Sequence, residues 1–258
     1  MLTHPLLPKL KSLKLSGMMD TLEQRAQTAN QDSLAPLEFL ALLLDDELER
    51  REQNRLRKRI KESKMEDNKT LARFDFAASP QVPKTLLADL ALCRFVERGE
   101  NALFCGPTGT GKSHLAQALA LEAIKHGYQA LCRPTHTLLA SLHAGRADGS
   151  YPRLLKRLVN IDVLVLDDFG LVDLSSQAVE DLYEIIRERY ERRSILLTSN
   201  RAPEEWGEVF GSPLLASAAL DRLTHHAHVI MITGSSYRQK KSMKATAKTT
   251  ANAKNHAN

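Results

Sequence analysis

Residues 106–114 read GPTGTGKSH and match the phosphate-binding pattern G-x-x-x-x-G-K-[ST]. The glycines let successive backbone N–H groups curl around phosphate oxygens, and the start of the following helix adds positive potential. The ammonium group of Lys112 is expected to reach the outer phosphates, and the Ser113 hydroxyl is expected to bind Mg²⁺. We therefore predict an ATP and Mg²⁺ site whose nucleotide-binding residues are Gly106, Pro107, Thr108, Gly109, Thr110, Gly111, Lys112, Ser113 and His114.

Two adjacent aspartates follow a run of four apolar residues in VLVLDDFG, at residues 163–170. Two like charges at the end of a buried strand repel each other, so a positive group is expected nearby. In proteins with this phosphate loop, an acidic residue at the end of another strand holds Mg²⁺. We assign that role to Asp167, directly or through a water, and predict that Asp168 faces the attacking water as general base or orienting group. Lys112 and Mg²⁺ would supply the positive charge.

Short apolar strands alternate with helices in the region from residue 86 to residue 238. The expected strands are residues 102–105, 129–133, 163–167, 194–199 and 229–233. Such alternation implies parallel βαβ units. The predicted fold class is therefore α/β, with a five-stranded parallel sheet that carries helices on both faces.

The segments on either side of this region have a different composition. Residues 1–73 are helical in pattern and are predicted to form a small helical domain, in which an apolar stripe consists of Leu37, Leu40, Ala41, Leu44 and Leu48. Two prolines indicate that residues 74–85 are a linker. Residues 239–258 are polar and lysine-rich, and are predicted to be a disordered basic tail.

Composition restricts the possible surroundings and partners of the protein. No apolar run approaches the roughly 18 residues of a membrane span, and the first residues lack a signal-peptide core. The three cysteines lie far apart, which favours a reducing cytoplasm without zinc or disulfides. The net charge of +5 equals the contribution of five lysines in residues 239–258. Binding to nucleic acid must therefore be argued from local patches.

The stretches GPTGTGKSHLA, VLVLDDFG, LLTSN and AALDRLTHHA together resemble AAA+ ATPases of the group that DnaC-type helicase loaders share with IstB-type transposition helpers. By this resemblance, Asn200 matches the sensor-1 residue that holds the γ-phosphate or the water. Arg222 matches the arginine finger that reaches the neighbouring subunit's nucleotide, and Arg238 matches the sensor-2 arginine. In this family the acid that activates the water is commonly Glu. The side chain of Asp168 is one methylene shorter, which implies slow hydrolysis.

The N-terminal segment favours one branch of this group. LKLSGMMDTLEQR, the stretch from Glu38 to Lys64 and the following FDF are similar to the helical domain of IstB-type proteins. The resemblance implies an ATPase that forms homo-oligomers on duplex DNA and assists an insertion-sequence transposase. The alternative is a DnaC-type loader in DNA replication, and a third possibility is a nucleotide-switched scaffold that does not hydrolyse ATP.

A basic run is the main candidate for contacts with DNA phosphates, and consists of Arg50, Arg51, Arg55, Arg57, Lys58, Arg59, Lys61 and Lys64. The alternative interpretation is a solvated helix, partly neutralised by its own glutamates. A second basic set is Arg146, Arg153, Lys156 and Arg157. No aromatic residues interleave with either set, so contacts would be mainly with the DNA backbone.

Three histidines near the end of the sheet region, His225, His226 and His228, could suggest a metal site. Apart from Asp221, no acid or cysteine accompanies them at ligand spacing. The sequence therefore predicts no zinc site there.

Overall fold

The computed structural model describes residues 5–66, 68–234 and 236–237, so Arg238 and the predicted tail lie outside the described residues. Contacts divide the chain into two units, Met1–Arg59 and Ile60–Asn258. This division comes earlier than the predicted boundary at residue 73, because residues 60–73 contact the sheet unit. The Glu66 amide, for example, donates to Gln117 Oε1 over 3.0 Å.

The N-terminal unit is helical, as predicted. Its helices are α1 (Leu7–Ser12), α2 (Ser16–Gln31) and most of α3, which runs from Pro36 to Ser63. A small core holds them together and consists of Met18, Leu22 and Leu43, with Leu7, Leu10, Leu15 and Phe39 packed against it.

The apolar stripe predicted on α3 does not form this core. Leu37, Leu40, Leu44 and Leu48 are exposed, with 79% of the Leu37 surface accessible. Leu43 packs against α2 residues instead, since consecutive residues of a helix point about 100° apart. Periodicity identifies an apolar face, but it does not tell which face a neighbouring helix covers.

The second unit contains a five-stranded sheet, and this prediction is confirmed. Its strands are β1 (Ala102–Cys105), β2 (Ala130–Pro134), β3 (Val163–Phe169), β4 (Ser194–Ser199) and β5 (His228–Met231). They are ordered β2-β3-β4-β1-β5, and every neighbouring pair is parallel. The strand ends differ from the predicted ones by at most two residues.

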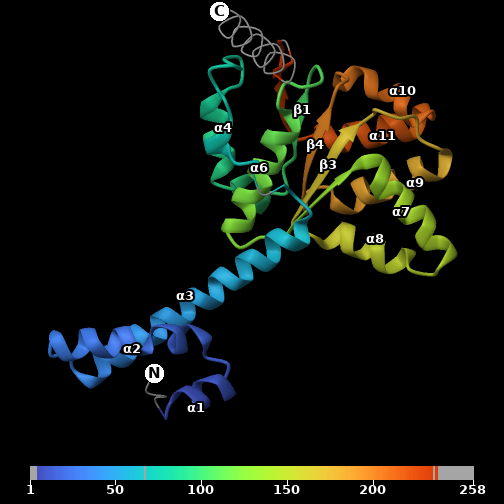
Figure 1. The fold of residues 1–258 in the computed structure, drawn as a ribbon. Helices are drawn as coiled ribbons and strands as arrows, with labels where there is room; N and C mark the ends of the chain where they lie inside the picture. The colour runs from blue at the N-terminus through green and yellow to red at the C-terminus, as the bar shows by residue number, and fades with distance from the viewer. Residues whose placement is uncertain (1–4, 67, 235, 238–258) are drawn as a thin grey trace, which may run out of the picture. The chain divides into compact units, whose positions relative to one another are not determined.

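Helices cover both faces of the sheet (Figure 1). On one face lie α4 (Lys84–Ala91) and α6 (Lys112–Lys125). On the other lie α7 (Thr135–Ala147), α8 (Tyr151–Asn160), α9 (Ser176–Arg189), α10 (Trp206–Phe210) and α11 (Pro213–Thr224), whose apolar residues form one core with the sheet. Short helices complete the unit: α5 (Arg94–Glu97) and the 3₁₀ helices Leu71–Arg73 and Pro203–Glu205.

The three cysteines are unpaired and buried. Burial raises the pKa of Cys105 to about 11 and that of Cys132 to about 12, so both stay as thiols at neutral pH. Among the described residues, no helix has the length and apolar character needed to cross a membrane.

Candidate nucleotide-binding site

The loop from β1 to α6 bends where its glycines adopt positive φ. Gly106 has φ 141°, and a side chain there would collide with the carbonyl oxygen of Ile232. Gly111 has φ 97°, and a Cβ atom there would lie 2.6 Å from the ring of Phe74. Only glycine combines this backbone conformation with such close neighbours, so these two positions of the motif are fixed by sterics.

Lys112 is the first residue of α6, and only 6% of its surface is exposed. Its Nζ atom donates to the carbonyl oxygens of Gly106, over 2.6 Å, and Pro107, over 2.8 Å. The Thr110 hydroxyl also donates to the Pro107 carbonyl, over 2.9 Å, and braces the loop. The side-chain cation therefore lies against the loop, beside the start of α6, and the N–H groups of a helix start attract anions.

The two aspartates lie in a β-bulge near the end of β3, where the register with β4 shifts between Leu166 and Phe169. Asp168 has φ 53°, a left-handed conformation that is uncommon for residues other than glycine. The Thr198 hydroxyl donates to Asp167 Oδ1 and accepts the Asp168 amide over 2.9 Å. A bulge re-aims side chains, and here one threonine holds a half-buried aspartate and an exposed one side by side.

A cavity of about 640 Å³ joins the phosphate loop to the ends of β3 and β4. This volume is typical of small-molecule sites, which span about 300–1,000 Å³. The predicted residues that line it are Thr108, Gly109, Thr110, Gly111, Lys112, Ser113, His114, Asp167, Asp168 and Asn200. These residues come from three separate segments, and they meet because parallel strands place their carboxyl ends at one edge of the sheet.

The residues of this cavity fit a nucleotide with its metal ion. The Ser113 hydroxyl and the Asp167 carboxylate both line it, and oxygen atoms of this kind are the ligands that Mg²⁺ prefers. The same cavity contains Lys112 and glycines whose backbone could approach phosphates closely. Cation, hydroxyl and carboxylates therefore occur together in one cavity.

Of the two predicted arginines, Arg222 lies outside the cavity and Arg238 lies outside the described residues. Arg222 lies on α11, where its Nη1 donates to the Ala218 carbonyl over 2.7 Å. Its guanidinium carbon is 5.7 Å from the Tyr183 ring centre and 5.9 Å from that of Tyr190. It does not line the cavity of its own chain. Arg238 lies outside the described residues, although Tyr237 lines the cavity and its amide donates to the Gly109 carbonyl over 2.9 Å.

The sequence analysis missed a further wall of the cavity, which comes from the segment assigned to the end of the helical domain and to the linker. It consists of Glu66, Lys69, Arg73, Phe74, Asp75 and Ser79. The Phe74 ring packs edge-on against His114, with ring centres 5.5 Å apart. His114 Nε2 in turn lies 2.7 Å from the Thr70 carbonyl oxygen. The FDF stretch could have pointed to this wall, but its contact with the phosphate loop depends on tertiary packing.

The first basic set is a mixture of paired and unpaired side chains. Arg50 pairs with Asp20 over 3.1 Å and Arg51 with Glu47 over 2.7 Å. Arg55, Arg57 and Arg59 form no ion pair with another residue that the structure describes. Lys58, Lys61 and Lys64 are exposed, and Lys58 also has an interaction partner.

The second basic set also divides. Arg146 pairs with the buried Asp181, and its guanidinium carbon lies 3.9 Å from the centre of the Tyr151 ring. Arg146 therefore serves the packing of α7 against α9, since its partner carboxylate is buried. The other three members, Arg153, Lys156 and Arg157, are exposed and lie on one side of α8, at i, i+3 and i+4.

Residues 8–245 match the IstB-like ATP binding protein family. The chain belongs to this family. It is 42% identical to an ATP-binding protein of an insertion sequence in Mycobacterium tuberculosis, over 90% of this chain and 93% of the relative. It is 36% identical to the ATP-binding protein of insertion sequence IS21 from Pseudomonas aeruginosa, over 94% and 91%.

Solved structures with a similar fold include DnaI, with a TM-score of 0.57 and 22% identity over 66% of this chain and 95% of DnaI. AMPPCP-bound DnaA from Aquifex aeolicus has a TM-score of 0.55 and 20% identity, over 66% of this chain and 51% of that one. These likenesses confirm the predicted fold of the sheet unit. Membership of an ATP-binding family supports ATP as the ligand of the cavity.

Proposed function

We propose that this IstB-like chain hydrolyses Mg²⁺-bound ATP in the cavity and uses the nucleotide to assemble on DNA. The observation that supports hydrolysis is the convergence of Lys112, Asp167, Asp168 and Asn200 on one cavity with the glycine loop. A nucleotide site that only binds needs the loop and the cation. A second carboxylate beside the proposed metal-binding one supports hydrolysis, because it is placed to orient or deprotonate a water.

Each residue then has a distinct role. Lys112 and the start of α6 bind the phosphates, and Ser113 and Asp167 hold Mg²⁺, which offsets phosphate charge when bound. Asp168 accepts the proton of the attacking water or orients it, and the Asn200 amide positions the γ-phosphate or the water without adding charge. Because Asp168 is one methylene shorter than Glu, we expect turnover to be slow.

We further propose that catalysis requires a second copy of the chain. Arg222 lies on α11 and outside the cavity of its own chain, where a neighbouring subunit could receive it as an arginine finger. Arginine in this role stabilises charge that develops in the transition state. Oligomers would therefore hydrolyse ATP, and isolated subunits would not. Arg238 is proposed as the sensor-2 arginine because of the sequence resemblance to AAA+ ATPases described above.

The proposed partners are duplex DNA and a transposase. The relatives at 36–42% identity are proteins of insertion sequences, which supports action on DNA beside a transposase, in the cytoplasm. The likeness to DnaI shows the fold alone, so it does not argue for a helicase loader. The exposed cations on α3 support contacts with DNA phosphates, which carry no sequence information.

Phosphate release from ATP, measured with Mg²⁺ and with unrelated duplexes of equal length, tests this function. We expect slow turnover that rises with DNA and with protein concentration, and that stops when EDTA removes the metal ion. Sedimentation with ATP and DNA should show oligomers. ATP binding without turnover, even in the presence of DNA, would contradict the proposed ATPase activity. The protein would then be a nucleotide-switched scaffold.

A further inference from the structure

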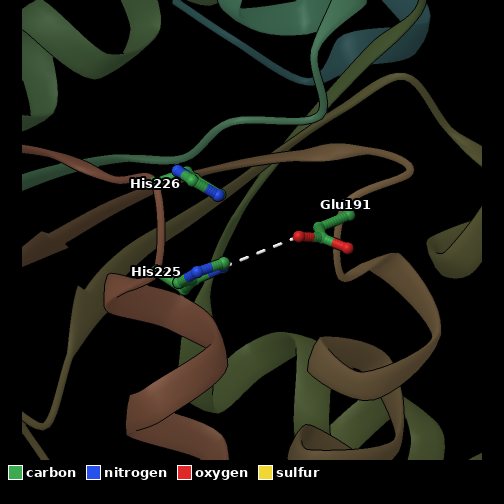
Figure 2. Close-up of side chains that lie close together, drawn as sticks. All are labelled: Glu191, His225 and His226. Atoms are coloured by element: carbon green, nitrogen blue, oxygen red, sulfur yellow. Dashed lines mark ion pairs between the residues drawn. The ribbon is translucent and has the colours of Figure 1, made fainter.

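Three potential metal ligands lie together on the surface of the sheet unit, away from the nucleotide cavity. Glu191 lies in the turn between α9 and β4, and His225 and His226 directly follow α11. One ligand atom from each lies within 4.8 Å of the other two, and all three residues are exposed (Figure 2). The sequence predicted no zinc site here because Glu191 precedes His225 by 34 residues along the chain.

The backbone on both sides of this cluster is held in place. Glu191 and His226 have φ values of 56° and 53°, which non-glycine residues adopt only when the surrounding structure imposes them. The amides of Arg192 and Arg193 both donate to the Arg189 carbonyl over 2.9 Å. The His225 amide donates to the Asp221 carbonyl over 3.0 Å. The two chain segments therefore present their side chains from fixed backbone positions.

The side chains already interact with one another. His225 Nδ1 lies 3.6 Å from Glu191 Oε1 and 2.8 Å from the Tyr190 hydroxyl, and the rings of His225 and His226 have centres 3.9 Å apart. Two imidazoles and a carboxylate are a common ligand set for Zn²⁺, and imidazole also suits Ni²⁺ and Cu²⁺. Bonds of about 2.0–2.2 Å in a tetrahedral arrangement place ligand atoms about 3.3–3.6 Å apart, a spacing that rotation of the exposed side chains can provide.

We propose that Glu191, His225 and His226 bind one divalent transition-metal ion, with water in the remaining coordination positions. The site is built from side chains and does not depend on the proposed ATPase. It lies next to Arg222, because Tyr190 contacts both the Arg222 guanidinium and His225. A bound ion would link the end of α11 to the turn after α9, and so restrain the aromatic surface on which Arg222 rests. This last consequence rests on the proposed role of Arg222.

Zn²⁺ titration of the full chain, without a polyhistidine tag and freed of metal, tests the site by calorimetry. We expect one equivalent to bind with a dissociation constant below about 100 µM. Glu191→Gln and His226→Ala should each weaken binding at least about tenfold, because each removes one of three ligands. His143→Ala is the matched control, since it removes an exposed histidine of α7 outside the cluster. Circular dichroism verifies that each variant is folded.

Cu²⁺ provides a second readout that depends on the ligands themselves. Electron paramagnetic resonance of the Cu²⁺ complex should show two imidazole nitrogens in the wild type and one in His226→Ala. Lys112 lines the nucleotide cavity and is not one of the three ligands, so Lys112→Ala should bind Zn²⁺ like the wild type. The metal site is therefore tested independently of the proposed ATPase activity. Zn²⁺ binding weaker than about 100 µM, or unchanged in the Glu191 and His226 variants, would overturn the metal site.

Discussion

The nucleotide cavity and the basic stretch of α3 both carry clustered charge, but they are built in opposite ways. Around the cavity, charged residues from separate segments converge, and hydrogen bonds such as those of Thr198 and Lys112 hold them. Along α3, the basic residues follow one another on a single helix, and most of them are exposed. Some of them pair with carboxylates of the same unit, as Arg51 does with Glu47.

This difference determines how each region should respond to substitution. In a convergent, partly buried site each group has a fixed position and specific partners, so the loss of a single side chain should have a large effect. On an exposed helix, water and salt screen each charge, so contributions are small and roughly interchangeable. The comparison therefore predicts steep losses at the cavity and graded ones on α3.

The largest effect is expected from Lys112→Ala. The substitution removes the buried cation beside the phosphate loop and should abolish ATP binding or hydrolysis while the fold remains. The control is Lys125→Ala, at the other end of α6, whose ammonium group pairs with Glu122 on the surface. Phosphate release and fluorescent-nucleotide binding measure the difference. Normal turnover in a folded Lys112→Ala protein would refute the site.

Arg222→Ala should bind ATP almost normally and lose hydrolysis by roughly 10³-fold, because a finger arginine acts on the transition state. The variant should also fail to assemble on DNA with ATP. Mixing Arg222→Ala with Asp168→Asn subunits should restore part of the activity, since complete sites can form at mixed interfaces. No recovery at any mixing ratio, with mixed assembly verified by sedimentation, would count against a shared site.

Asp168→Asn should retain Mg²⁺-ATP binding and reduce turnover by about 10² or more, because the group that accepts or orients the water is lost. Asp167→Asn should instead raise the Mg²⁺ concentration needed for half-maximal turnover and lower the affinity for nucleotide, because a proposed metal ligand is lost. Metal titrations of both variants distinguish the two roles. If Asp168→Asn were the variant that lost nucleotide affinity, the roles of the two aspartates would be reversed.

Thr198→Val is expected to cost about tenfold in turnover, although the residue binds neither phosphate nor metal. Its hydroxyl contacts both Asp167 and Asp168, and valine keeps the shape without the hydrogen bonds. Thr28→Val is the control, because the Thr28 hydroxyl donates to the Gln24 carbonyl of its own helix. An unchanged Mg²⁺ dependence in Thr198→Val would show that the bulge alone holds the aspartates.

The smallest change per residue is expected on α3. Replacing Arg55, Arg57 and Arg59 with alanine should weaken binding to unrelated duplexes alike, and flatten the salt slope by up to about 3. The matched variant on α8 replaces Arg153, Lys156 and Arg157, and a truncation removes residues 239–258. Salt titrations with ATP compare all three. Loss of most of the slope in either of the latter would move the DNA contact to that segment.

Much of the nucleotide site could be predicted from the sequence because its signals are local. The glycines of residues 106–111 permit the positive φ values that the loop adopts, and Lys112 and Ser113 follow them directly. Apolar runs of strand length alternating with helices were enough to predict five parallel strands. Such patterns depend on covalent neighbours, so they can be read along the chain.

Other features were decided by tertiary structure alone. Thr198 holds the two aspartates only because β4 lies beside β3, and Phe74 covers Gly111 only because the linker folds over the phosphate loop. Glu191 meets the histidines only where the turn after α9 approaches the end of α11. On α3, packing placed Leu43 inside and the predicted stripe outside. A sequence states which side chains are available, whereas packing between distant segments selects the ones that meet.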